Sequence, residues 1–158
     1  MKVFLSYGSA ADQVTALRLQ ALGAVNGLTV YVPPAYTRQQ FTAVPFDEDS
    51  ARKMNEADVI LGVVGVAIST ACQLELQASL TSRKPTIVMA APNVAPQLQS
   101  SFGSKLIVVD PANPDRAELE IVQHLKHLEA EKRAKSALIA LGTVALGLLV
   151  LAAFVPQD

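Results

Sequence analysis

Glu75 is the residue whose type and surroundings point most directly to chemistry. It stands in the segment STACQLELQASL (69–80) and is the only carboxylate between Asp58 and Arg83. Leucine flanks it on both sides, which predicts a carboxylate in poorly solvated surroundings. Such a carboxylate can stabilise positive charge that develops during a reaction, because little water screens it. The structural alternative is a helix glutamate that points to water or pairs with an arginine.

Cysteine and histidine give weaker signals. Cys72 lies one helical turn before Glu75, but no histidine is near it in sequence, which favours packing over nucleophilic catalysis. His124 and His127 lie on a charged segment, where solvated side chains are favoured over metal ligands, so no metal site is expected. The chain also has no P-loop and no G-x-G-x-x-G motif for phosphate binding.

Two loops carry further candidate binding residues. Ser6, Tyr7, Gly8 and Ser9 end the first apolar run, and the glycine and serine would let the backbone approach a phosphate or ribose. An ordinary turn is an equally good interpretation. In the loop 33–46, the aromatic residues available to stack on a base or to contact a neighbouring copy are Tyr36 and Phe41.

Apolar runs and helical periods alternate along the chain, and together they predict the elements that position these residues. The strands are expected at 2–7, 28–32, 58–64, 85–92 and 105–110. The helices are expected at 11–27, 47–57, 69–82, between the last two strands, and from 114 onward. This alternation is typical of a doubly wound, mostly parallel α/β sheet, in which ligands bind at the carboxyl ends of the strands.

The apolar residues of two helices carry the helical period. In 11–27 they are Val14, Leu17, Ala21, Leu22 and Val25, and an Asn-Gly pair ends the segment. In the last helix they are Leu119, Val122, Leu125 and Leu128. The segment DVILGVV (58–64) is a continuous apolar run, which predicts a strand covered on both faces.

Composition limits the class of protein. The chain has 158 residues, a net charge of −1 and a single cysteine, so it fits one compact domain in a reducing compartment and gives no argument for nucleic-acid binding. Residues 136–155 contain no charge and no proline, which predicts a transmembrane helix. The expected organisation is a domain over 1–130, a basic juxtamembrane segment over 131–135 and a membrane span over 136–155.

The charges beside the apolar run predict its orientation. Lys126, Lys132, Arg133 and Lys135 precede it, whereas only three residues follow it, and none of these is basic. Positive charge stays on the cytoplasmic side of a membrane. The chain is therefore expected to be a single-pass membrane protein whose N-terminal domain faces the cytoplasm.

Two motifs resemble those of Toll/interleukin-receptor (TIR) domains. The first is VFLSY (3–7), followed by a Ser/Asp loop, and the second is S-x-x-C-x-x-E-L, formed here by Ser69, Cys72, Glu75 and Leu76. In element order and spacing the resemblance covers about residues 1–125. It implies a flavodoxin-like TIR fold with a five-stranded, mostly parallel sheet.

The resemblance also implies a function. In TIR enzymes the glutamate of the second motif cleaves NAD⁺, so Glu75 is the expected catalytic residue, and Ser69 and Cys72 join the substrate-binding candidates. NAD⁺ is then a substrate, and no cofactor is expected. Such enzymes act when copies assemble and the loop after the second strand completes a neighbour's site. Bacterial relatives serve in signalling or antiviral defence.

The chain departs from the family pattern at two places, which keeps other functions open. Ala71 stands where many members have tryptophan, and Pro33 and Pro34 stand where many carry an acid after the second strand. The first departure favours a non-catalytic TIR scaffold that recruits partners at the membrane. A nucleoside deoxyribosyltransferase-like enzyme is a third possibility, because such enzymes share this fold and use a glutamate as nucleophile.

Overall fold

The computed structural model describes residues 1–35, 48–110 and 112–153, and the chain divides into two compact units, Met1–Val122 and Gln123–Asp158. Strands and helices alternate along the first unit. Their order is β1 (Lys2–Tyr7), α1 (Asp12–Val25), β2 (Thr29–Tyr31), α3 (Glu48–Glu56), β3 (Val59–Val64), α4 (Thr70–Thr81), β4 (Thr86–Ala90), α5 (Ala95–Phe102), the 3-10 turn η1 (Gly103–Lys105), β5 (Leu106–Val108) and α6 (Pro114–Ala153). The predicted strands and helices are confirmed, most of them to within two residues at each end.

The five strands form one sheet in the order β2-β1-β3-β4-β5, and every neighbouring pair is parallel. This confirms the predicted doubly wound α/β class. All six residues of β3 are buried, as the continuous apolar run predicted. The chain leaves β1 toward β2 on one side and returns to β3 on the other, so the topological switch point lies between β1 and β3.

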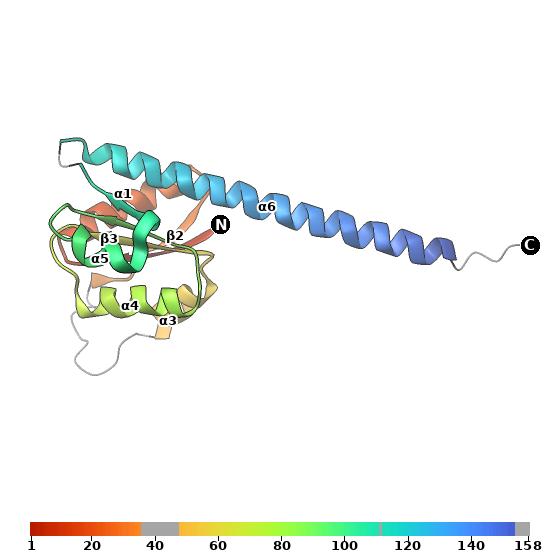
Figure 1. Ribbon diagram of the computed structural model, residues 1–158, viewed down its shortest axis with the longest axis horizontal. Coiled ribbons are helices and arrows are strands. Elements are labelled where there is room, and N and C mark those ends of the chain that lie inside the picture. The colour runs from red at the N-terminus through yellow and green to blue at the C-terminus, as the bar shows by residue number, and fades with distance from the viewer. Residues whose placement is uncertain (36–47, 111, 154–158) are drawn as a thin grey trace, which may run out of the picture. The chain divides into compact units, whose positions relative to one another are not determined.

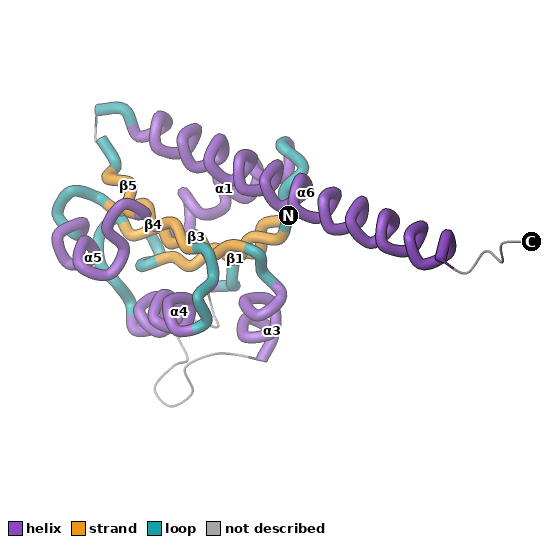
Figure 2. Tube along the Cα trace, turned by 45° about the vertical axis from the view of Figure 1, so that its right-hand side comes forward, coloured by secondary structure: helices purple, strands orange, loops and turns teal. Residues whose placement is uncertain are grey.

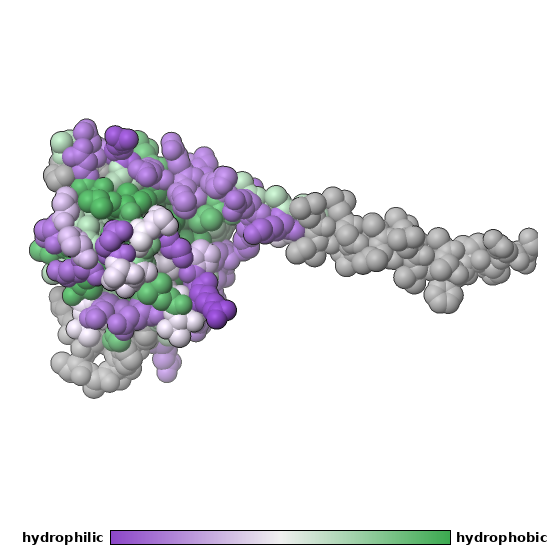
Figure 3. Space-filling model, in the orientation of Figure 1, coloured by the Kyte–Doolittle hydropathy of each residue, from purple (hydrophilic) through white to green (hydrophobic). Residues whose placement is uncertain are grey.

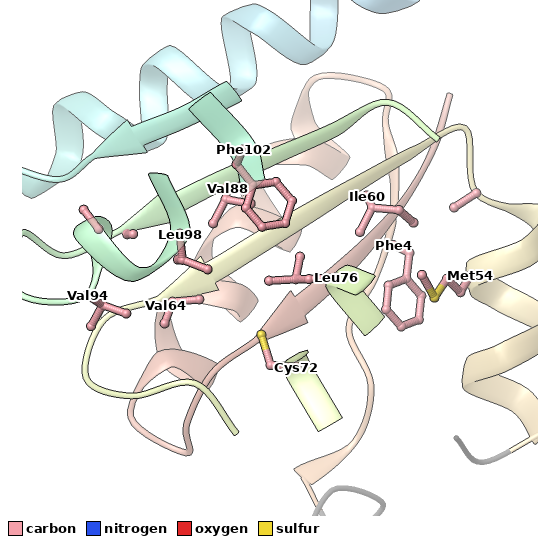
Figure 4. Close-up of a cluster of buried hydrophobic side chains, with 13 residues drawn as sticks. Phe4, Met54, Ile60, Val64, Cys72, Leu76, Val88, Val94, Leu98 and Phe102 are labelled. Atoms are coloured by element: carbon pink, nitrogen blue, oxygen red, sulfur yellow. The ribbon is translucent and has the colours of Figure 1, made fainter. Parts of the chain in front are cut away.

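Helices α3, α4 and α5 cover one face of the sheet, and α1 lies on the other (Figure 1, Figure 2). The core beneath α3, α4 and α5 is a single cluster of buried apolar side chains. Figure 4 shows Val88 of β4 beside Phe102 of α5 and Phe4 of β1 beside Met54 of α3, with Leu76 of α4 between these two pairs. Burial of such side chains is the main favourable term in the folding of this layer.

Helix α1 differs from expectation in the face that it buries. Val14 is 64% exposed, Leu17 49% and Val25 88%, although these residues carried the helical period. The buried positions of α1 are Asp12, Ala16, Leu19 and Gly23. The apolar stripe on which the helix prediction depended is therefore turned to the surface.

Close packing explains this inversion. A Cβ atom on Gly23 would lie 2.6 Å from Cγ2 of Val30, so α1 approaches β2 closely through a position without a side chain. Small residues such as Ala16 permit this approach, whereas a stripe of valine and leucine would hold the helix farther from the sheet. Leu119 of α6, also part of a predicted stripe, is likewise exposed.

The predicted membrane span falls partly outside the described range, because residues 154–158 are not described. Within the part of the chain that the structure describes, no helix meets the length and apolarity needed to cross a membrane. Loop residues 36–47, with Tyr36 and Phe41, also lie outside the described residues.

Gly62 sets the distance between α4 and the sheet. A Cβ atom at this position would lie 3.1 Å from Cδ2 of Leu76 and 3.3 Å from Cγ1 of Val88. We expect Gly62→Val to lower the free energy of unfolding by about 1–3 kcal/mol through overpacking, and Gly62→Ala to lower it less. Chemical denaturation of the full chain in detergent measures both. A valine variant as stable as wild type would contradict the close approach of α4.

Candidate active site

Three predicted residues meet between β1 and α4. Ser6 lies near the carboxyl end of β1, next to Gly62 of β3 in the parallel register. Cys72 and Glu75 lie three positions apart on α4, so both side chains project from the same side of the helix. All three are buried, with exposures of 0% for Ser6, 0% for Cys72 and 3% for Glu75.

The Ser6 hydroxyl holds the Glu75 carboxylate. Its Oγ donates to Oε2 of Glu75 at 2.5 Å, and Sγ of Cys72 lies 3.2 Å from this Oγ of Ser6. A serine hydroxyl has one proton to donate, and the shorter distance assigns it to the carboxylate. The lone acid of this segment is therefore neither solvated nor on the surface: it is buried and hydrogen-bonded at the sheet edge where doubly wound folds bind ligands.

The start of α4 is fixed by Ser69, the N-cap residue, whose side chain accepts a hydrogen bond from the Cys72 N–H at 3.2 Å. This bond satisfies one of the backbone donors that a helix leaves unpaired at its first turn. Ser69 thus positions the turn that carries Cys72 and Glu75. Ala71 in the same turn is buried as well, so this position presents no aromatic surface to a substrate.

The other predicted residues of the first loop bond to the protein in other directions. The Tyr7 hydroxyl donates to the Pro33 carbonyl at 2.9 Å, and the Gly8 N–H donates to the Val63 carbonyl at 2.8 Å. The Gly8 carbonyl accepts from the Ser69 N–H at 3.0 Å. These bonds join the end of β1 and the residue after it to β3 and to the segments after β2 and β3.

Asp12 is a residue of this region that sequence reasoning missed. It is 5% exposed, and its carboxylate accepts from the Ser9 hydroxyl at 2.7 Å and from the Gly65 N–H at 2.8 Å. The bonds connect the loop after β1 to the turn after β3 across the switch point. The sequence offered one signal for this role: Asp12 opens a predicted helix and lies three residues after Ser9, a spacing at which the two side chains can bond to each other.

Two of the pockets in the described part of the chain are lined by residues other than Glu75. One is a groove of about 560 Å³ between α4 and α5. The other has about 150 Å³ and is lined by Asp12, Arg18 and Glu118, among others. The described residues also contain no group of three or more His, Cys, Asp or Glu side chains suited to a metal ion.

The chain matches no model of a known protein family, and a search of curated proteins also finds no match. The interpretation of the site therefore depends on its geometry and on the two sequence motifs.

An ion-pair cluster borders the smaller pocket. The Arg18 guanidinium lies 2.7 Å from Oδ1 of Asp115 and 3.2 Å from Oε2 of Glu118. Burial raises the pKa of the Glu118 carboxyl above its ordinary value, and the nearby Arg18 opposes this rise. The folded chain thus binds the Glu118 proton more tightly than the unfolded chain does.

This raised pKa predicts a pH dependence of stability. The contribution of Glu118 favours folding below its ordinary pKa and is lost as pH rises through the folded pKa. We expect Glu118→Gln, which cannot ionise, to gain stability relative to wild type as the pH rises above the ordinary glutamate pKa of about 4.3 and through the raised pKa of the folded chain. Denaturant unfolding at several pH values measures the difference, with the exposed Glu120→Gln as control. A difference that stays constant with pH would contradict the assignment.

Proposed function

We propose that the protein cleaves the bond between nicotinamide and ribose in NAD⁺, as a glycohydrolase or a cyclase, with Glu75 as its catalytic residue. The observation that carries the proposal is the buried Glu75 carboxylate held at 2.5 Å by Ser6 near the carboxyl end of β1. The resemblance of the VFLSY and S-x-x-C-x-x-E-L motifs to those of TIR enzymes supports NAD⁺ as the substrate.

The chemistry requires little besides one carboxylate. Nicotinamide in NAD⁺ is already cationic, so it leaves as a neutral molecule without being protonated. As its bond to ribose breaks, positive charge develops on the ribose carbon, as in glycoside hydrolysis. The Glu75 carboxylate stabilises this charge or holds the ribose hydroxyls, and its poorly solvated position strengthens the interaction.

The second step completes the balance of atoms. In hydrolysis, water adds to the ribose carbon and releases a proton, which yields ADP-ribose and nicotinamide. In cyclisation, a nitrogen of the adenine base attacks the same carbon instead. The substrate-binding candidates around this carbon are Ser6, Tyr7, Gly8, Ser9, Ser69 and Cys72, with Tyr36 and Phe41 of the loop as stacking or assembly residues.

The proposal includes self-association and a membrane anchor. Assembly lets the loop 33–46 of one copy complete the site of a neighbour, as in the family that the motifs resemble. The apolar run 136–155 serves as a single membrane span, and the basic residues before it keep the N-terminal domain in the cytoplasm, where NAD⁺ is present. The biological role is signalling or defence triggered by assembly.

A non-catalytic scaffold is the second candidate, and one observation favours it. Ala71 is buried and small at the position where the resembled family often has a tryptophan, so any stacking surface for nicotinamide must come from another residue. A scaffold would keep the fold and the assembly surfaces without cleaving NAD⁺.

Replacement of Glu75 separates these functions. We expect Glu75→Gln to lower nicotinamide release by at least about 100-fold, because the developing charge loses its counter-charge. The full chain is assayed at high density on vesicles with NAD⁺, and separately with deoxynucleosides, and Glu120→Gln serves as an exposed control. Activity of Glu75→Gln equal to wild type would refute the catalytic role. A wild-type chain that cleaves neither NAD⁺ nor deoxynucleosides would support the non-catalytic scaffold. Cleavage of deoxynucleosides alone would indicate a deoxyribosyltransferase.

Ser6→Ala tests whether the hydrogen bond positions the carboxylate. We expect kcat to fall about 10- to 100-fold with little change in KM, and the acid limb of the pH–rate profile to move to higher pH, because a donor to the ionised carboxylate is lost. Ser79→Ala is the matched control. Ser79 is also buried on α4, but its hydroxyl donates to the Leu76 carbonyl at 2.6 Å. Equal kinetics and pH profiles for the two variants would assign Ser6 a purely structural role.

A further inference from the structure

The turn 65–69 between β3 and α4 determines where α4 begins. Apolar burial does little to fix the middle of this turn, because Val66 is 63% exposed and Ala67 is exposed as well. Exposed apolar residues of this kind also lie among polar ones on the face of the first unit that is in view in Figure 3. The position of the turn is therefore expected to depend on hydrogen bonds at its two ends.

Both ends of the turn bond to the loop after β1. At the start of the turn, the Gly65 N–H donates to Oδ1 of Asp12 at 2.8 Å. At its end, the Ser69 N–H donates to the Gly8 carbonyl at 3.0 Å, and Ser69 is the residue that caps α4. These two contacts attach the helix that carries Glu75 to the loop that follows β1.

The Asp12 carboxylate uses both of its oxygens in this attachment. Oδ2 accepts from the Ser9 hydroxyl at 2.7 Å, while Oδ1 accepts from Gly65. The side chain is 5% exposed, so water competes little for these bonds. A single buried carboxylate thus joins the loop after β1 to the turn after β3.

Two glycines let the loop and the turn approach this closely. A Cβ atom on Gly65 would lie 2.4 Å from Oδ1 of Asp12, and a Cβ atom on Gly8 would lie 2.2 Å from the Ala67 carbonyl oxygen. Real Cβ atoms essentially never approach other atoms to such distances. The loop and the turn are therefore in direct contact, and a displacement of one is transmitted to the other.

We propose that Asp12 is a positioning residue for Glu75. Its two bonds fix the turn from which α4 starts, and α4 in turn carries Glu75 to within 2.5 Å of the Ser6 hydroxyl. Without the Asp12 carboxylate, the first turns of α4 open away from β1 in part of the molecules. The consequence for catalysis rests on the proposed function: a displaced carboxylate stabilises the charge on the ribose carbon less well.

Cys72 reports such an opening without any assay of catalysis. It is the single cysteine of the chain, it is 0% exposed, and its Sγ lies 3.2 Å from Oγ of Ser6. A thiol reagent reaches it only when α4 moves away from the sheet or when the whole chain unfolds. These two routes differ in their dependence on urea, because local opening exposes little surface and global unfolding exposes much.

Maleimide labelling of Cys72 in the full chain in detergent, followed by mass spectrometry, tests the proposal. We expect Asp12→Ala to raise the labelling rate at least about tenfold, with little dependence on low concentrations of urea. Asp12→Asn should label within about twofold of wild type, because its amide oxygen can accept from Gly65 and its amide nitrogen can donate to the Ser9 hydroxyl.

Two further variants keep the test decisive. Gly65→Ala leaves Asp12 in place but sets a Cβ atom against its Oδ1, so it should raise labelling even if Asp12→Ala does not fold. Asp110→Ala is the matched control, because this carboxylate accepts from the Ala112 N–H at 2.9 Å after β5 and should leave labelling unchanged. Labelling of Asp12→Ala at the wild-type rate would overturn the proposal. Labelling that follows global unfolding in urea, or equal labelling of the alanine and asparagine variants, would overturn it too.

Nicotinamide release separates this inference from the proposed function. In an active chain, Asp12→Ala should lower kcat about tenfold or more with little change in KM, and Asp12→Asn should restore most of the loss. In a Ser6→Ala background the same alanine substitution should lower kcat much less, because the bond through which Asp12 acts is already missing. An active chain whose kcat is unchanged by Asp12→Ala would overturn the positioning role and leave Glu75 catalytic. A chain that does not cleave NAD⁺ would refute the proposed function, and the labelling rates would still decide whether Asp12 positions α4.

Discussion

Burial of the Glu75 carboxylate is the constraint on which the rest of the structure depends. An acidic group in apolar surroundings is costly unless it is hydrogen-bonded, and the Ser6 hydroxyl supplies a bond of 2.5 Å. That bond forms only if α4 lies close to β1 and β3, which the missing side chain at Gly62 permits. The packing of the core and the position of the carboxylate therefore depend on each other, because a change that moves α4 away from the sheet also moves Glu75.

The sequence predicted most of the fold because strands and helices differ in period. The continuous apolar run of β3 and the alternation of elements were enough for the doubly wound class. The burial of α1 could not be predicted in the same way, because it depends on how closely Gly23 approaches Val30. A hydrophobic period is enough to identify a helix. When a second side of the helix carries small residues, however, the side that is buried depends on how closely the helix approaches the sheet.

The candidate site was predictable in part. The two motifs selected Ser6, Cys72 and Glu75, and the structure brings these together, yet no pattern in the sequence contained the distance between them. Asp12 was missed because its partner Gly65 is 53 residues away, and hydrogen bonds of that range leave no local period. Its carboxylate closes the gap between the loops after β1 and β3, where a doubly wound sheet would otherwise be open.

The strand order also governs how the chain reaches its native state. β1 is the first strand made, but it lies inside the sheet, between β2 and β3. During synthesis its second edge stays unpaired until the residues up to Val64 have left the ribosome. Parallel pairings of this range close long loops, which makes folding slow and exposes strand edges to other chains. Ser6 meets its partner only when α4 has been made, so the nascent chain lacks the hydrogen bond to Glu75 until the residues up to Thr81 have left the ribosome.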